Sequence, residues 1–255
     1  MSAPSVLMGA IGFHNLLFGE GFLNLRAGRL LLMDFVRPEH RSLTRFGYPG
    51  ASLRVGLNPT ALDSTQHGVD VYGRLWGRRI FYQAAVVQGA QGADGVRDLD
   101  PHKDLFGLVQ LTVAQRATLG LLHYRGKTQL VSDTNGLRVR FTDTFRVTGV
   151  TGEAWAGPFT FFGQALYGFH DNPSGTDIHS EYWAYRAEID GYLAHRWVLV
   201  ARYDQITSHH ELERRQATVH VSYLLLTNLK LSFESTAPLQ GAESTVLSLR
   251  LDLAL

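Results

Sequence analysis

The stretch that decides the fold is the last one, Leu247-Ser248-Leu249-Arg250-Leu251-Asp252-Leu253-Ala254-Leu255. Every second residue is a leucine, and the residues between them are small, polar or charged. Successive side chains of a β-strand point to opposite sides, so a strand places all of these leucines on one face. A helix would spread them around its circumference. The stretch therefore predicts a strand with one apolar and one polar face.

The same alternation continues upstream and predicts about twelve strands. Their expected ranges are 22–33, 67–76, 79–88, 104–113, 117–125, 137–156, 159–169, 180–193, 197–206, 215–226, 229–236 and 245–255. Within residues 1–20, Met8 to Phe13 supplies a further strand or the remnant of one. The segment Asp34 to Gln66 contains three prolines, which predicts a long loop with an embedded strand around Ala51 to Leu57.

The connections between these strands alternate between short and long. Short links fall at Gly77-Arg78, at Gly157-Pro158 and at Ala194-His195-Arg196. Long links fall at residues 89–103, 126–136, 171–179 and 207–214. A meander with this alternation has all its short turns on one side and all its long loops on the other. The sequence thus predicts an all-β protein, an antiparallel up-and-down transmembrane β-barrel, formed by residues 1–255 as a single domain.

Composition and motifs exclude several other classes. The 24 Lys and Arg residues nearly balance 23 Asp and Glu, which gives no sign of nucleic-acid binding. The absence of cysteine excludes disulfide scaffolds, thiolate metal sites and cysteine nucleophiles. No G-x-S-x-G, Walker loop or H-E-x-x-H motif occurs. His209-His210 lies in a long polar loop and is interpreted as a solvated pair rather than a metal site. We therefore expect no enzyme and no cofactor.

The polar faces of the strands point into the barrel if the apolar faces meet lipid. The expected pore-lining residues are charged and of both signs: Asp70, Arg74, Arg138, Arg140, Arg146, Arg186, Glu188, Asp190, Arg202, Asp204, Lys230, Glu234, Arg250 and Asp252. Neither sign dominates this set. The local excess of positive charge at Arg138, Arg140 and Arg146 is the feature most able to favour anions.

One region resembles a known family. It comprises Gly68-Val69-Asp70-Val71-Tyr72-Gly73-Arg74, Arg79 to Gly89, and Asp100 to Phe106 with Lys103-Asp104. The upstream stretches Leu25 to Leu30 and His40 to Thr44 add to this resemblance as a strand that enters a long loop. Together they resemble the outer-membrane phosphate-selective porin (O/P-like) family, with Gln88 in place of the usual Asn. The resemblance implies a porin fold and, because such porins are longer, an N-terminally truncated member.

These observations predict an outer-membrane porin, located in the cell outer membrane of a Gram-negative-type bacterium. It would form a passive diffusion channel for small hydrophilic or charged solutes, surrounded by outer-membrane lipid, with a homo-oligomer as an expected assembly. One alternative is a porin-like sheath around a multihaem cytochrome electron conduit on the periplasmic or extracellular side. Another is a soluble all-β binding barrel, in which the apolar faces would point inward.

Overall fold

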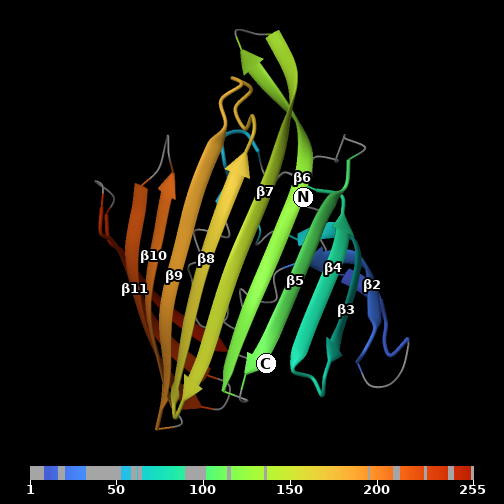
Figure 1. The fold of residues 1–255 in the computed structure, drawn as a ribbon. Coiled ribbons are helices and arrows are strands. Elements are labelled where there is room, and N and C mark those ends of the chain that lie inside the picture. The colour runs from blue at the N-terminus through green and yellow to red at the C-terminus, as the bar shows by residue number, and fades with distance from the viewer. Residues whose placement is uncertain are drawn as a thin grey trace.

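The fold was analysed in a computed structural model of the whole chain. It describes residues 9–16, 21–32, 53–58, 62, 65–89, 102–113, 116–134, 137–194, 196–208, 213–226, 229–240 and 244–253. Thirteen strands form one curved sheet (Figure 1). They are β1 (Gly9–Phe13), β2 (Asn24–Leu31), β3 (Thr65–Leu75), β4 (Ile80–Val87), β5 (Asp104–Val113), β6 (Ala117–Thr134), β7 (Leu137–Ala156), β8 (Phe159–His170), β9 (Ser180–Leu193), β10 (Trp197–Ser208), β11 (Glu213–Leu226), β12 (Leu229–Pro238) and β13 (Val246–Leu253).

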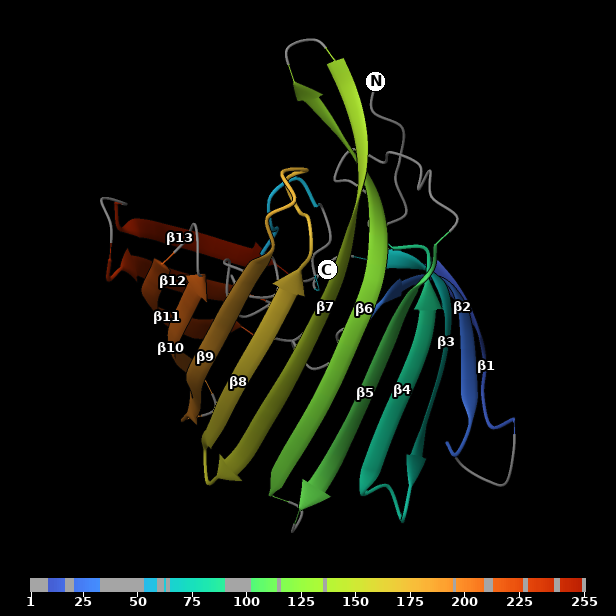
Figure 2. The same ribbon diagram turned by 45° about the horizontal axis from the view of Figure 1, so that its top comes forward.

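The strands follow one another in sequence order across the sheet, and every pair of neighbours is antiparallel. The sheet curls around an interior (Figure 2). Among the described residues, β1 and β13 pair with one neighbour each, so the described sheet is open between them. All twelve strands expected from the alternation are confirmed, and β1 is the further strand expected near Met8 to Phe13. No described helix is long and apolar enough to cross a membrane.

Two expectations about loops are wrong. Residues 126–134 are not part of a long loop, because β6 runs to Thr134 and pairs with β7 up to Leu137. This hairpin projects beyond its neighbours (Figures 1 and 2). Residues 126–134, its β6 side, are mostly polar, so this side lacks the apolar alternation that marked the other strands. The embedded strand around Ala51 to Leu57 is also not found: residues 53–58 form a turn closed by a bridge between Val55 and Asn58.

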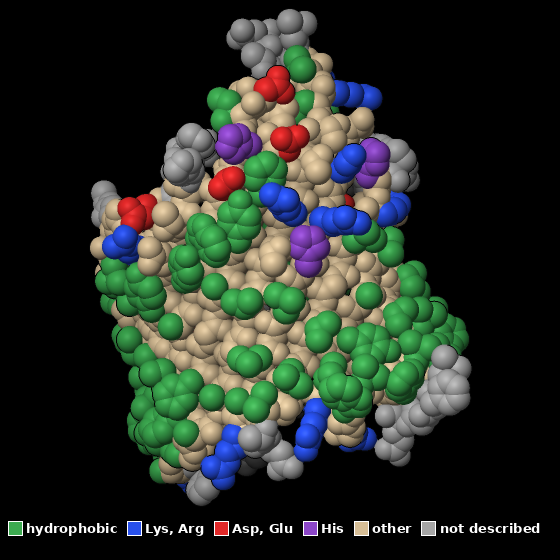
Figure 3. Space-filling view, viewed as in Figure 1, with side chains coloured by type: hydrophobic (Ala, Val, Ile, Leu, Met, Phe, Trp, Pro, Cys, Tyr) green, Lys and Arg blue, Asp and Glu red, His purple; other side chains and the backbone are tan. Residues whose placement is uncertain are grey.

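Large apolar side chains cover the outer face of the sheet. Members of this belt include Val69, Val109, Leu119, Leu121, Val150, Phe161, Ile189, Leu199, Val219, Phe233 and Leu249, all of which are exposed. Figure 3 shows the belt as apolar side chains on the middle and lower parts of the molecule, with most charges above and below it. A soluble barrel buries its apolar face. The outward belt therefore contradicts the soluble alternative and matches a wall built to contact lipid.

Aromatic residues mark both edges of this belt. In the upper row, on the long-loop side, Tyr167 pairs with Trp183. In the lower row, next to the short turns, Trp197 pairs with Tyr223 at 4.6 Å between ring centroids. Ten residues separate Trp183 from Leu193, the β9 residue that pairs with Trp197. At about 3.3 Å per residue and a tilt of about 40°, the two rows lie about 25 Å apart. This is the height of the apolar band of outer-membrane barrels.

The interior divides into two zones. Toward the long loops it is apolar, with a buried cluster that includes Leu108, Leu122, Tyr124, Phe145 and Leu166. Val55 and Leu62, from the long connection between β2 and β3, belong to the same cluster. The described residues 53–58 and 62 of this connection therefore lie inside the barrel and pack against the inner wall. Toward the short turns the inner face is polar and charged, and this zone is the candidate site.

Candidate functional site: the inner face of the sheet

Most of the residues expected to line a pore lie on the inner face. Asp70 is on β3, and Arg74 follows on the same side near the turn, with its guanidinium over the ring of Phe81. The others belong to β9, β10, β12 and β13, four of the last five strands of the sheet: Arg186, Glu188, Asp190, Arg202, Asp204, Lys230, Glu234, Arg250 and Asp252. The alternation thus brings them together on one wall.

Arg138, Arg140 and Arg146 do not lie on that wall, and the expectation for these three is corrected. Inward-facing residues of β7 have odd numbers, as the burial of Phe145 and Val147 shows. Arg146 is exposed on the outer face, 4.9 Å from the ring centroid of Phe169. Arg138 and Arg140 are exposed in the projecting part of the hairpin. The interior is apolar at this height, so Phe145 and Val147, not the arginines, take the inward positions.

The charges of β9 and β10 are complementary across the strands. Arg186 lies opposite Asp204, and Glu188 lies opposite Arg202. Along each strand the charges pair as well: Arg186 Nη2 lies 2.5 Å from Glu188 Oε2, and Arg202 Nε donates to Asp204 Oδ2 at 2.8 Å. All four residues are 5% exposed or less. Such a network holds buried charges only because each is matched by an opposite one.

On β11 and β12 the wall is made of hydroxyls and one imidazole. Thr218 and Thr236 are hydrogen bonded at 2.9 Å. One step lower, His220 Nδ1 lies 2.9 Å from Glu234 Oε2, and its Nε2 lies 2.5 Å from the Ser222 hydroxyl. Ser222 in turn reaches Ser232 at 2.9 Å. A polar ladder therefore continues the charged wall from β10 to β12.

Two further groups extend the wall on either side. On β3, Asp70 accepts hydrogen bonds from Arg26 Nη2 at 2.5 Å and from Gln83 Nε2 at 2.7 Å. Near the short turns, Asp252 lies 2.9 Å from Arg250 Nε and 3.3 Å from Lys230 Nζ. Asp252 is 37% exposed at its side chain, in contrast to the charges of β9 and β10. The charges nearest the turn-side mouth are thus the ones that water reaches most easily.

Some polar groups on this wall have no hydrogen-bond partner among the described residues. They include both amide atoms of Gln164 on β8 and Oδ1 of Asp204. Burying such groups without a partner costs about 1–3 kcal/mol each, so they are expected to bind water. The arrangement is therefore suited to a hydrated interior next to an ordered set of ion pairs.

A separate cluster fixes the inward-folded connection. Asn58 Nδ2 donates to Asp143 Oδ2 at 2.6 Å, and His170 Nδ1 lies 2.7 Å from the same oxygen. Asp143 lies five residues beyond Thr148, the β7 residue that pairs with Tyr167, and so above the apolar belt. Burial raises the pKa of Asp143, but hydrogen bonds from His170, Asn58 and the Asn172 amide outweigh this effect and lower it. Asp143 is therefore a charged anchor for Asn58 at the long-loop end.

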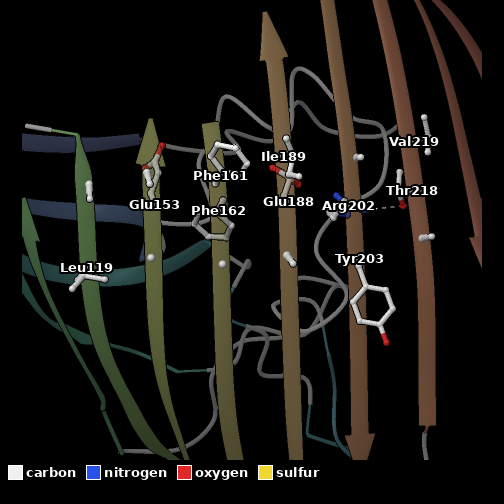
Figure 4. Close-up of a pocket in the computed structure, with 17 residues that line it drawn as sticks. Leu119, Glu153, Phe161, Phe162, Glu188, Ile189, Arg202, Tyr203, Thr218 and Val219 are labelled. Carbon is white, nitrogen blue, oxygen red and sulfur yellow. Dashed lines mark hydrogen bonds between the residues drawn. The ribbon is translucent and has the colours of Figure 1, made fainter. Parts of the chain in front are cut away.

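A shallow groove of about 790 Å³ crosses the outer face over β6 to β11. Small residues such as Gly152, Gly163 and Ala187 form its floor, and the larger side chains around them form its sides. Figure 4 shows the groove, with Leu119 and Tyr203 along it and the Arg202–Thr218 hydrogen bond on the same strands. Its lining is almost entirely apolar, as expected of a surface that contacts acyl chains.

The sequence could not reveal several parts of the site. Thr218, Ser222 and Ser232 are uncharged and common on any polar face, so only strand phase identifies them. The Asn58–Asp143–His170 cluster joins segments far apart in the chain, which no local pattern indicates. No group of three or more His, Asp or Glu suited to a metal occurs among the described residues. His209-His210 lies outside them.

Comparison with known proteins bears on the fold. No protein-family model and no curated protein sequence matches the chain. Several solved structures match it. One is a porin with 10% sequence identity and a TM-score of 0.62, and the match covers 91% of this chain and 78% of that porin. An anion-selective porin from Comamonas acidovorans has 12% identity and a TM-score of 0.62, covering 92% and 71%.

A third structure is the outer-membrane OmpT of Vibrio cholerae, with 14% identity and a TM-score of 0.59. The match covers 84% of this chain and spans 66% of the length of OmpT. One of the OmpT structures is described as a trimer. The chain therefore has the fold of outer-membrane β-barrel porins.

Proposed function

We propose that this chain, as one barrel domain over residues 1–255, is an outer-membrane channel for the passive diffusion of small hydrophilic solutes. The observation that carries the proposal is the division of the sheet into two faces. An apolar belt of about 25 Å, edged by aromatic rows, surrounds a wall of polar and charged side chains. Polar groups facing the inside of a membrane-spanning barrel are typical of a water-filled path.

The inward-folded connection sets the width of this path. Val55 and Leu62 pack against the inner wall, and Asn58 is anchored to Asp143. They occupy interior space toward the long-loop end. This arrangement favours a narrow channel over a sheath, because a sheath needs an interior wide enough for a multihaem protein. We therefore expect small solutes to pass and large ones to be excluded.

The charges predict weak ion selectivity. On β9 and β10 each arginine is matched by a carboxylate, and Asp190 leaves a formal excess of only one negative charge. An anion-selective porin shares the fold, but the arginine excess expected on β7 lies outside the barrel here. The motifs between Gly68 and Phe106 support a relation to the phosphate-selective-porin-like family, and the trimer form of OmpT supports a homo-oligomer.

Solute uptake by proteoliposomes tests the proposal. Vesicles containing the folded protein should swell in an iso-osmotic solution of a pentose, and more slowly in one of a trisaccharide. Empty vesicles and vesicles with heat-denatured protein are the controls. Swelling no faster than in empty vesicles would contradict a channel. Equal rates for both sugars would contradict the narrowing by the connection between β2 and β3.

A further inference from the structure

Basic side chains gather on the outer face just above the apolar belt. His102 and Lys103, which precede β5, and Arg125 and Lys127 on β6 line a pocket of about 350 Å³, called the basic pocket below. It lies at the step where β5 begins and β6 continues upward beside it. Figure 3 shows Lys and Arg side chains above the belt in this region. None of these residues takes part in the inner wall.

The strand register gives the height of the basic pocket. The upper aromatic row runs from Trp183 through Tyr167 and Thr148 to His123. Arg125 lies two residues above His123 on the same face and pairs with Arg146. Two residues correspond to about 7 Å along a strand. Because aromatic rows sit at the level of the lipid headgroups, these two arginines lie at or just above that level.

The ionisable side chains among the described residues that line the basic pocket are all basic. The carboxylate of Asp104 is fully buried and points inward, where it accepts hydrogen bonds from the Tyr124 hydroxyl and the Lys127 amide. Arg146 stands over the ring of Phe169, which holds its guanidinium on the outer face beside Arg125. Leu105 pairs with Arg125 and is exposed at the pocket, and below His123 the wall is apolar, with Leu121 exposed.

We infer that the basic pocket binds the phosphate-bearing headgroup of a lipid in the outer leaflet. The long loops and the projecting hairpin share this side of the sheet, and such loops face outward from the cell. A phosphorylated lipid matches both parts of the surface: its phosphates meet arginine and lysine, and its acyl chains lie on the apolar belt. The inference rests on the membrane placement proposed above, not on conduction.

Native mass spectrometry of the folded protein in a non-ionic detergent tests this inference. The probes are bisphosphorylated lipid A, the same lipid without phosphates, and inorganic phosphate. The test variant is Arg125→Gln with Lys127→Gln. The matched control is Arg138→Gln with Arg140→Gln, which removes the same charge from the same hairpin. Since Arg140 lies four residues from Thr144, which lines the pocket, the control positions are about 13 Å or more beyond the pocket.

The wild type should bind bisphosphorylated lipid A, and more tightly than the phosphate-free lipid. Loss of two charge-assisted contacts should weaken this binding about tenfold or more in the test variant, and less than about twofold in the control. Equal weakening in both variants, or none in either, would overturn the inference. If inorganic phosphate bound as tightly as the lipid, the inference would also be overturned, because the basic pocket would then be a site for free anions. Insertion into vesicles, measured in parallel, reports separately on the membrane placement.

Discussion

Two variants, each with one new arginine at a different height on the outer face, should show how deep in the membrane the apolar belt lies. Val219 is 51% exposed and pairs with Ala201, close to midway between the two aromatic rows. Leu251 is 62% exposed but pairs with Leu231, in the row of Tyr223 and Trp197 at the lower edge. An outward arginine costs about 2–4 kcal/mol at the bilayer midplane and about 0–1 kcal/mol near the interface. We therefore expect Val219→Arg to destabilise the inserted barrel by about 2–4 kcal/mol and Leu251→Arg by about 1 kcal/mol at most.

The assay is reversible unfolding in denaturant of each variant in lipid vesicles, followed by tryptophan fluorescence. The two variants carry the same new charge on the same face, so the difference between their free energies of unfolding reports the depth of each position in the membrane. Equal costs at Val219 and Leu251 would refute the assigned height of the belt. A cost below about 1 kcal/mol at Val219 would refute the lipid-facing orientation of β11.

Three other predictions concern the inner wall and its anchor. Glu234→Ala should destabilise the barrel by about 1–3 kcal/mol, because it leaves Nδ1 of the buried His220 without its hydrogen-bond partner, whereas Glu234→Gln should cost less; denaturant unfolding compares them. In planar bilayers, Lys230→Gln should shift the reversal potential toward cations and Asp252→Asn toward anions, and shifts of the same sign would contradict a lumen position for these residues. The pKa of Asp143 is lowered in the folded protein. The stability that ionised Asp143 gives to its contact with Asn58 should therefore be complete at a pH above the ordinary pKa of about 3.9, and it should be lost as the pH falls through the folded pKa. The protection factors of the amides of residues 53–58 in hydrogen exchange, which correct for the intrinsic pH dependence of the rate, should thus be equal at pH 7 and pH 5 and fall only below the ordinary pKa. A lower protection factor already at pH 5 would contradict this anchor.

The fold could be predicted from sequence because a strand in a membrane wall is constrained on both faces. The alternation of leucine with Arg250 and Asp252 fixes the phase of β13 without knowledge of its neighbours. The prediction of which side chains point inward was wrong on β7, where Phe145 and Val147 are apolar but point inward. There the wall packs against the folded-in connection, a contact between distant segments that no alternation records. The upper part of β6, residues 126–134, was missed for the related reason that this segment lies above the belt and neither of its faces meets lipid.

The central claim is that the inner face lines a water-filled path across the barrel. The chain has no cysteine, so a single cysteine can be placed on either face without background. Asp252 points inward and its side chain is 37% exposed, whereas Phe233 on the neighbouring strand points outward and is 45% exposed. In planar bilayers, a charged, membrane-impermeant thiol reagent should react with Asp252→Cys and lower its conductance, but leave Phe233→Cys channels unchanged. Wild-type protein that never conducts, or an Asp252→Cys channel that conducts but whose current does not change on exposure to the reagent, would contradict the claim.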